Sequence, residues 1–172
     1  ILIFSHLSNL FYNALRVTIM KKLFAVATFA VATLFGVSEA QAQTYKTGAG
    51  VLVDFGDGST FVGPHVKHFF QPNHAGEFSV LFADGATVAQ ANYQYHQPFA
   101  GANGLQWYIG AGPGIIFGDG FTEFAPSAML GLDFKIPGAP LDFSMDWRPR
   151  FIIGDNSDAE AGRFNAGFRF TF

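Results

Sequence analysis

The sequence predicts an all-β protein, an eight-stranded antiparallel up-and-down transmembrane β-barrel preceded by a cleavable signal peptide, and three observations support this prediction. Clusters of Gly, Pro, Asn and Asp divide residues 43–172 into segments of similar length. Apolar and polar residues alternate along most of these segments, as they do in strands with one apolar face. The chain also ends in RFNAGFRFTF, where an aromatic residue falls on nearly every second position.

Residues 20–42 have the pattern of a targeting segment. Met20, Lys21 and Lys22 precede the apolar stretch LFAVATFAVATLFGV, and Ala40 and Ala42 supply the small residues of a cleavage site. We therefore expect a signal peptide over residues 20–42 and a mature domain over residues 43–172. Residues 1–19 are interpreted as upstream sequence read through from a wrong start. The alternatives are a retained membrane anchor and a buried helix.

Composition excludes several classes of protein. The chain of 172 residues has 22 Phe, 20 Gly, no Cys and a formal net charge of -3. Without cysteine there is no disulfide scaffold, no thiolate nucleophile and no zinc–thiolate site. The mild acidity provides no basic patch for nucleic acid. We expect no cofactor, no metal and no nucleic-acid partner.

Turn signals define the expected strands. Seven clusters mark turns, because these residues favour tight backbone conformations. The clusters are GDGS at Gly56, QPNHAG at Gln71, ADG at Ala83, QPFAGANG at Gln97, GDGFTE at Gly118, PGAP at Pro137 and GDNSDAEAG at Gly154. Seven turns separate eight strands, which is an even number and places both termini at one end of a barrel.

Alternation assigns the two faces of the expected strands. The apolar face comprises Tyr45, Ala49, Val51, Val53 and Phe55; Thr87, Ala89, Ala91, Tyr93 and Tyr95; Leu105, Trp107, Ile109, Ile115 and Phe117; Leu141, Phe143, Met145, Trp147 and Phe151; and Phe164, Ala166, Phe168, Phe170 and Phe172. The polar face includes Lys46, Gln90, Asn92, Gln94, His96, Gln106, Tyr108, Asp142, Ser144, Asp146, Arg148 and Arg150.

Two architectures could use such strands. In a soluble barrel the apolar face points inwards, whereas in an outer-membrane barrel it meets lipid and the polar face fills the lumen. The polar face here carries small residues suited to a crowded lumen, namely Gly48, Gly50, Gly110, Gly112, Gly114, Gly131 and Gly167. The apolar face is rich in aromatic residues near strand ends, so we expect Trp107, Phe143 and Trp147 to face lipid.

Four stretches of the mature chain, GPHVKHFF, LQWYIGAGPGIIF, LGLDFKIPGAPLDFSMDWRPRF and the terminal FRFTF, carry a family resemblance. The chain resembles the small eight-stranded outer-membrane proteins of Gram-negative bacteria, of the OmpX and OmpA-barrel type, and especially their Bacteroidetes-like relatives. In that family a last strand ending in Phe is the signal for the barrel-assembly machinery. The resemblance assigns this role to Phe168, Phe170 and Phe172; the alternative is a merely apolar edge strand.

The expected topology assigns the charged residues either to the outer connections or to the lumen. Turns after the second, fourth and sixth strands face the periplasm with the termini, and the other four connections face outwards. The outer connections then contain acids without Lys or Arg: Asp57, Asp84, Asp119, Glu123, Asp155, Asp158 and Glu160. The lumen is expected to hold Asp54, Glu77, Asp133, Asp142 and Asp146 with Lys46, Lys67, Lys135, Arg148, Arg150, Arg163 and Arg169.

These lumen charges should pair and exclude a continuous water path, because an eight-stranded barrel is just wide enough to be filled by side chains. We expect Lys135 to lie beside Asp142, and Arg169 to reach Asp142 or Asp146. No pore is expected. Pro64, Pro113, Pro126 and Pro149 fit a closed barrel poorly, so bulges or strand ends are expected at these prolines.

The sequence gives no positive case for catalysis. The mature histidines are His65, His68, His74 and His96, and none has the Ser and acid spacing expected of a lipid-acting hydrolase. We interpret the chain as a non-enzymatic, monomeric barrel of the cell outer membrane, with a structural or surface-interaction role, in contact with outer-membrane lipid and lipopolysaccharide. The alternatives are an outer-membrane lipid-modifying enzyme and a soluble periplasmic ligand-binding barrel.

Overall fold

The computed structural model describes residues 45–154 and 157–172, which form strands and tight connections only. The expected upstream segment, signal peptide and cleavage site, and Asp155, lie outside the described residues. The strands are β1 (Thr47–Gly56), β2 (Ser59–Gln71), β3 (His74–Ala83), β4 (Ala86–Pro98), β5 (Leu105–Gly112), β6 (Gly114–Gly118), β7 (Phe121–Phe124), β8 (Ser127–Lys135), β9 (Leu141–Trp147), β10 (Arg150–Ile152), β11 (Asp158–Glu160) and β12 (Phe164–Thr171).

The twelve strands make eight continuous wall segments, because four pairs of short strands follow one another along the same line. Each of β1 to β4 is one segment, and β5–β6, β7–β8, β9–β10 and β11–β12 are the others. All pairings are antiparallel, and each segment pairs with its neighbours in sequence. β12 pairs with β1 from Gly48–Thr171 to Phe55–Phe164, which closes the barrel. The expected fold class is confirmed.

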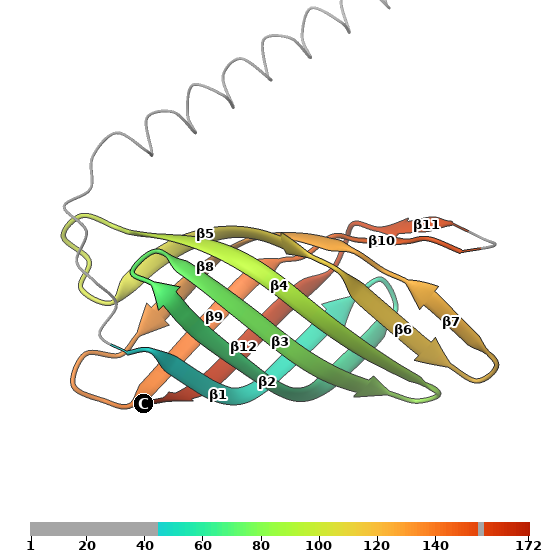
Figure 1. Ribbon diagram of the computed structural model, residues 1–172, viewed down its shortest axis with the longest axis horizontal. Coiled ribbons are helices and arrows are strands. Elements are labelled where there is room, and N and C mark those ends of the chain that lie inside the picture. Colours follow the sequence, from blue (N-terminus) through green and yellow to red (C-terminus); the bar gives the residue numbers. More distant parts are fainter. Residues whose placement is uncertain (1–44, 155–156) are drawn as a thin grey trace, which may run out of the picture. The chain divides into compact units, whose positions relative to one another are not determined.

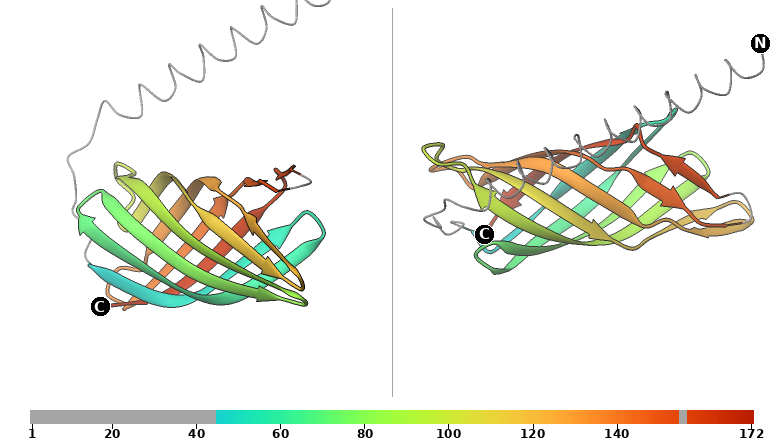
Figure 2. Two further views of the ribbon diagram at one scale, coloured as in Figure 1. Left: turned by 45° about the vertical axis from the view of Figure 1, so that its right-hand side comes forward. Right: turned by 90° about the horizontal axis from the view of Figure 1, so that it is seen from above.

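The strands wrap obliquely around a common interior (Figures 1 and 2). One end of the barrel carries the C-terminus, Tyr45 and the connections over residues 72–73, 99–104 and 136–140. We call this the terminus end. The opposite end, which we call the loop end, carries the β1–β2, β3–β4, β6–β7 and β10–β11 connections. This grouping matches the topology expected from an even number of strands.

Two hairpins show why the turn signals in the sequence were informative. Gly58 has φ 80° and Gly85 has φ 73°, in the left-handed region that glycine adopts without steric cost. Each glycine follows an aspartate in a two-residue turn, as expected for tight hairpins. Asp57 itself adopts φ 45°. These turns fix the register of the strands on either side.

Three prolines interrupt adjacent wall segments at nearly the same level. Pro113 separates β5 from β6, and the registers on both sides of it place it opposite Pro126, which separates β7 from β8. Pro149 separates β9 from β10, and its carbonyl accepts from the Ala128 amide. A proline cannot donate the reciprocal ladder bond. The expectation of strand ends is met at these three positions, whereas Pro64 lies within β2 without a break. We call the three interrupting prolines the proline seam.

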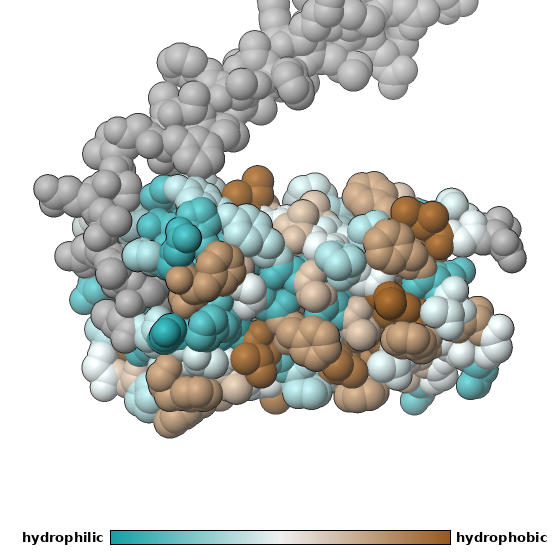
Figure 3. Space-filling model, viewed as in Figure 1, coloured by the Kyte–Doolittle hydropathy of each residue, from teal (hydrophilic) through white to brown (hydrophobic). Residues whose placement is uncertain are grey.

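The polarity of the barrel is inverted relative to a soluble protein. Among the described residues, the buried side chains comprise 22 polar or charged residues and 11 hydrophobic ones, while 25 large hydrophobic residues are exposed. Figure 3 shows hydrophobic side chains over much of one outer wall. In soluble proteins large apolar residues are mostly inside, and Arg is almost never fully buried unless paired. Within the described ranges, no helix is both long enough and apolar enough to cross a membrane.

The face assignment from the sequence is wrong at the start of β1. Tyr45 was expected on the apolar outer face and Lys46 in the lumen, but Tyr45 is buried and Lys46 is exposed. Strict alternation fails here because these two residues precede the first ladder residue, Thr47, and lie outside the sheet. The Tyr45 side chain turns into the lumen, where its ring packs edge-on against Phe69.

Candidate functional site

The lumen contains the chemically distinctive side chains, and Arg169 lies at the centre of its terminus half. This residue of β12 is fully buried, and its Nη2 lies 2.7 Å from Asp142 Oδ2 and 2.8 Å from Asp133 Oδ2. Its Nε donates to Asp142 Oδ2 and its Nη1 to Ser144 Oγ. One guanidinium therefore joins β12 to β8 and β9. The lumen side chains of these strands meet because β9 pairs with both of the other two.

Two further donors complete the group around Arg169. Lys67 on β2 places Nζ 2.6 Å from Asp133 Oδ2, and the Tyr45 hydroxyl donates to Asp142 Oδ2 at 2.5 Å. Burial raises the pKa of the Tyr45 phenol well above its usual value, and the nearby Asp133 carboxylate adds to this effect. Tyr45 therefore acts as a neutral donor to Asp142. The Lys67 ammonium also lies 4.7 Å above the Tyr108 ring.

The middle of the lumen is organised by Arg148. Its Nη2 lies 2.8 Å from Asp146 Oδ2 and 3.0 Å from Glu77 Oε1, and its Nε donates to Asp146 Oδ1. The Tyr108 hydroxyl donates to the same Asp146 Oδ2 at 2.6 Å. Arg148 thus links β3 to the β9–β10 segment across the lumen. Such multiple, charge-assisted contacts are the strong class of hydrogen bonds.

Some buried polar atoms in this region have no hydrogen-bond partner within the described protein. They include both ring nitrogens of His65 and the Oδ1 atoms of Asp133 and Asp142. His65 Nδ1 lies 3.7 Å from Glu77 Oε2, beyond hydrogen-bond distance.

We call Lys67, Glu77, Asp133, Asp142, Asp146, Arg148 and Arg169 the lower network. The lower network joins β2, β3, β8, β9 and β12. It contains four acids and three bases.

A second ionic group lies in the loop half of the lumen. Arg163 Nη2 lies 2.7 Å from Asp54 Oδ1, and Arg150 Nη2 lies 2.6 Å from Glu160 Oε2. Longer contacts link Arg150 to Asp54 at 3.8 Å and Arg163 to Glu160 at 3.5 Å. Both guanidinium groups stack over the Phe61 ring, at 5.5 and 5.3 Å from its centroid. We call Asp54, Arg150, Glu160 and Arg163 the upper quartet; its two acids balance its two bases.

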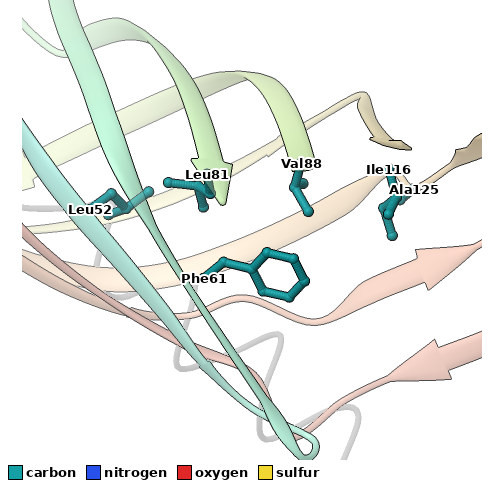
Figure 4. Close-up of a cluster of buried hydrophobic side chains, with 6 residues drawn as sticks. All are labelled: Leu52, Phe61, Leu81, Val88, Ile116 and Ala125. Atoms are coloured by element: carbon teal, nitrogen blue, oxygen red, sulfur yellow. The ribbon is translucent and has the colours of Figure 1, made fainter. Parts of the chain in front are cut away.

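An apolar cluster lies beside the upper quartet, and Phe61 belongs to it. This upper cluster comprises Leu52, Phe61, Leu81, Val88, Ile116 and Ala125, with Ala83, Ala86 and Ile152 packed against it. Figure 4 shows the six central side chains converging from different wall segments. Leu52, Leu81 and Val88 are completely buried. The loop half of the lumen therefore combines an apolar cluster with the two ion pairs of the upper quartet, whereas the terminus half is held mainly by the lower network, beside a small cluster of Tyr45, Phe69 and Ala75.

The structure brings together seven of the eight charged residues predicted for the lumen network, Asp133, Asp142, Asp146, Arg148, Arg150, Arg163 and Arg169, although in two groups. Lys135 stands apart. It faces Asp142 in the register of β8 and β9, but its Nζ donates to the carbonyls of Ile136 and Ala139. Asp142 already accepts from Arg169 and Tyr45, and the carbonyls of the adjacent turn are closer partners for Lys135.

Glu160 departs from the sequence assignment. It was expected in an acidic outer loop, but it is half-buried and contacts Arg150 and Arg163. Arg150 pairs with Glu160 in the register of β10 and β11, so the two residues face each other. The sequence contains no strand signal across residues 154–162 that would have revealed this pairing. Lys46, by contrast, contributes no lumen charge.

The outer wall carries the three predicted lipid-facing aromatic residues. Phe143 is 44% exposed and Trp147 is 45% exposed, while Trp107 is half-buried. The Trp147 indole donates to the Ala161 carbonyl at 2.7 Å. Phe168, Phe170 and Phe172 also face outwards, and Phe168 packs against Phe143 at 4.9 Å between ring centroids.

The terminal strand is held by backbone bonds as well. The Phe172 amide donates to the Thr47 carbonyl at 2.9 Å, and the Thr47 amide donates to Phe172 at 3.1 Å. The last residue of the chain is thus part of the ladder that closes the barrel. Among the described residues, no group of three His, Asp or Glu side chains is arranged to hold a metal ion.

Comparison with known proteins finds a structural neighbour but no family to which the chain can be assigned. No family model and no curated protein matches the sequence. Among solved structures, the chain is similar to the neisserial surface protein A, with 14% sequence identity and a TM-score of 0.48; the match covers 76% of this chain and 99% of that one.

Proposed function

We propose that this protein is a monomeric, non-enzymatic barrel of the outer membrane of a Gram-negative bacterium, with a side-chain-filled lumen and a structural or surface-interaction role. The inverted polarity of the wall and the lumen carries the proposal. Large apolar residues are exposed around the outside, while buried Arg, Asp and Glu meet inside. An aqueous environment would favour the opposite arrangement, because apolar surface is driven out of water.

The ladder also fits a membrane environment. In hydrocarbon, every backbone polar group must find a partner in the protein, and a closed barrel is the form of β-sheet that achieves this. Here β12 closes on β1 through eight residue pairs. Aromatic residues lie towards both ends of the outer wall, for example Phe55 stacked with Phe164 at the loop end and Phe143 with Phe168 towards the terminus end. Aromatic girdles of this kind flank the apolar band of outer-membrane barrels.

The packing of the lumen argues against a pore. The lower network and the upper cluster occupy successive levels, and their side chains are almost completely buried. We therefore expect no steady open channel when the pure protein is reconstituted in a planar bilayer. Large, continuous conductance would show that the lumen is wetter than this packing implies.

The outward Phe168, Phe170 and Phe172 support the proposed role of the last strand as a docking signal for the barrel-assembly machinery. Deleting Phe172 removes one exposed ring and one end of the closing ladder. Spontaneous folding in detergent should survive this deletion, while delivery to the outer membrane in cells should fall strongly. Phe134→Ala, which removes another outward ring, is the matched control. Equal delivery of the deletion variant and the wild type would contradict the docking role.

Two other functions can be separated from this one. A soluble periplasmic barrel should purify without detergent, and an enzyme acting on lipid should change the mass of lipid A when it is expressed. No observation in the lumen or on the wall favours either. The acidic loop end could contact lipopolysaccharide through bridging cations, since Asp57, Asp84 and Asp119 are exposed there.

The decisive experiment is membrane fractionation followed by electrophoresis with and without heating. We expect the protein in the outer-membrane fraction, with a folded form that migrates differently from the heated form. Recovery in the soluble periplasmic fraction, with no heat-dependent mobility, would overturn the proposal.

A further inference from the structure

The lower network contains one more acid than it contains bases. Its acids are Glu77, Asp133, Asp142 and Asp146, and its bases are Lys67, Arg148 and Arg169. All seven side chains are buried. A carboxylate taken out of water without an opposite charge is costly, so such a group is either paired or neutralised by a proton.

Two of the four acids contact two cations each. Glu77 lies 3.0 Å from Arg148 and 3.8 Å from Arg169. Asp133 lies 2.6 Å from the Lys67 ammonium and 2.8 Å from the guanidinium of Arg169. A carboxyl group beside two positive charges is strongly favoured in its ionised form. These two acids therefore account poorly for the excess.

Asp146 and Asp142 contact one cation each, but in different ways. Asp146 accepts from Arg148 with both oxygens, Oδ1 at 2.9 Å and Oδ2 at 2.8 Å. Asp142 accepts with Oδ2 alone, from Nε and Nη2 of Arg169 and from the Tyr45 hydroxyl. Its Oδ1 has no hydrogen-bond partner in the described protein. Because the Arg169 guanidinium also serves two other acids, Asp142 is the least compensated of the four.

Asp142 and Asp133 are within hydrogen-bonding reach of each other. Both accept from Nη2 of Arg169. An ionised carboxylate has acceptor atoms only, so two of them cannot bond to each other. A proton on one carboxyl group supplies the missing donor, as it does where two carboxylates share a site and only one ionises.

The buried histidines near the network are poorer positions for the proton. An imidazolium donates from both ring nitrogens. Within the described residues, neither nitrogen of His65 has a hydrogen-bond partner, and its Nδ1 lies 3.7 Å from Glu77 Oε2. His96 bonds to Gln94 Oε1 through Nε2, but its Nδ1 lacks a partner. A charge on either ring would leave a buried N–H group unpaired, which favours the neutral rings.

The other groups near the carboxyl pair add no compensating charge. Lys135 faces Asp142 in the register of β8 and β9, but its Nζ donates to carbonyls of the adjacent turn. The Tyr45 and Tyr108 side chains donate through uncharged hydroxyls. The upper quartet pairs its two acids with its own two bases.

We propose that Asp142 carries a proton in the folded barrel and donates it to Asp133, so that the lower network is neutral as a whole. The barrel thus has a buried proton-binding site between β8 and β9, filled from solution when the chain folds. The inference concerns the lumen alone and goes beyond the proposed function, because it does not depend on what surrounds the outer wall. Membrane fractionation therefore tests the proposed function without testing this site.

Infrared spectroscopy of the folded protein in detergent micelles detects the proton directly. At neutral pH exposed Asp and Glu are ionised, and a protonated carboxyl group has a carbonyl stretching band at higher frequency than ionised carboxylates and amides. We expect such a band in the wild type and its loss in Asp142→Asn. Asp54→Asn, which replaces a buried acid of the upper quartet, is the matched control and should keep the band.

Urea titration of the same two variants gives opposite shifts. The folded wild type holds a proton that the unfolded chain releases above about pH 4, so folding becomes less favourable as pH rises. Asn resembles the protonated carboxyl group and binds no proton. Asp142→Asn should therefore match the wild type near pH 4 and unfold at a higher urea concentration than the wild type at about pH 7. Asp54→Asn should unfold at a lower urea concentration, because it leaves Arg163 without its carboxylate.

Three results would overturn the proposal. Absence of the infrared band from the wild type, which can be measured whether or not a variant folds, would show that no carboxyl group is protonated. A lower urea midpoint for Asp142→Asn at every pH would make Asp142 an ordinary ion-pair carboxylate. A wild-type midpoint that is higher in sodium chloride than in choline chloride of equal ionic strength, without the band, would place a bound cation at this site.

Discussion

The two halves of the lumen differ in how much of their packing is ionic and how much is apolar. The terminus half holds the lower network, in which Arg169 and Arg148 each bridge two carboxylates. The loop half holds the upper cluster, where Leu52, Leu81 and Val88 are completely buried, beside a quartet of paired charges. The same barrel interior thus tolerates either ion pairs or hydrocarbon.

This contrast shows that burial alone does not determine how much a substitution destabilises the barrel. Removing one member of a buried ion pair leaves a charge without a partner, which costs more than the pair itself contributes. Removing an apolar side chain leaves a cavity, whose cost depends on how far the surroundings relax. The predictions below measure this difference along one barrel.

The largest effect is expected for Arg169→Ala. The substitution leaves Asp133 and Asp142 without their shared guanidinium, so the free energy of unfolding should fall by about 3–5 kcal/mol. Urea titration in detergent micelles measures it. Lys46→Ala removes an exposed cation and should change stability little. Unchanged stability of Arg169→Ala would mean that the network contributes nothing.

A cavity in the upper cluster should cost less. Leu81→Ala removes a completely buried side chain, so we expect a loss of about 2–4 kcal/mol in the same titration. Leu132→Ala, at an outward position of β8 that is 48% exposed, is the matched control and should lose clearly less. If the two Leu variants were equally unstable, the upper cluster would not be a packed core.

A hydroxyl that donates to the lower network should contribute least of the three buried groups. Tyr45→Phe removes the donor to Asp142 and should cost about 1–2 kcal/mol. Burial raises the pKa of the Tyr45 phenol above its usual value, so its contribution is present below about pH 10 and is lost as pH rises further. The stability difference between wild type and variant should therefore be constant from neutral pH to about pH 10 and shrink above it. A difference that disappears near neutral pH would contradict this assignment.

Sequence patterns predicted most of the wall and part of the lumen. Alternation along residues 141–151 placed Phe143 outside and Asp142 inside, because period two is a geometric property of a strand. Alternation could not place Tyr45 and Lys46, which precede the ladder. It also could not predict that Lys135 would bond to turn carbonyls, because that choice depends on competing partners in three dimensions.

The separation of the lumen charges into two groups was likewise beyond the sequence. The expected contact of Arg169 with Asp142 is present, but nothing in the sequence paired Arg163 with Asp54, which only the register around the barrel brings together. The upper cluster was missed for a related reason. Leu52, Leu81 and Val88 interrupt polar faces one residue at a time, and only the closed barrel brings them into contact.

The proline seam has a consequence for how such a barrel can diversify. Pro113, Pro126 and Pro149 each remove a donor from the ladder, but the register is the same on both sides of the seam, and β6 remains paired with β4. Residues inserted within β6 would therefore shift its pairing with β4, whereas residues added at the tip between β6 and β7 would leave the registers of β5, β8 and β9 unchanged. The exposed β6–β7 tip at Asp119 and Gly120 lies beyond all of these pairings, which makes it a natural position for grafting foreign peptide segments onto the barrel.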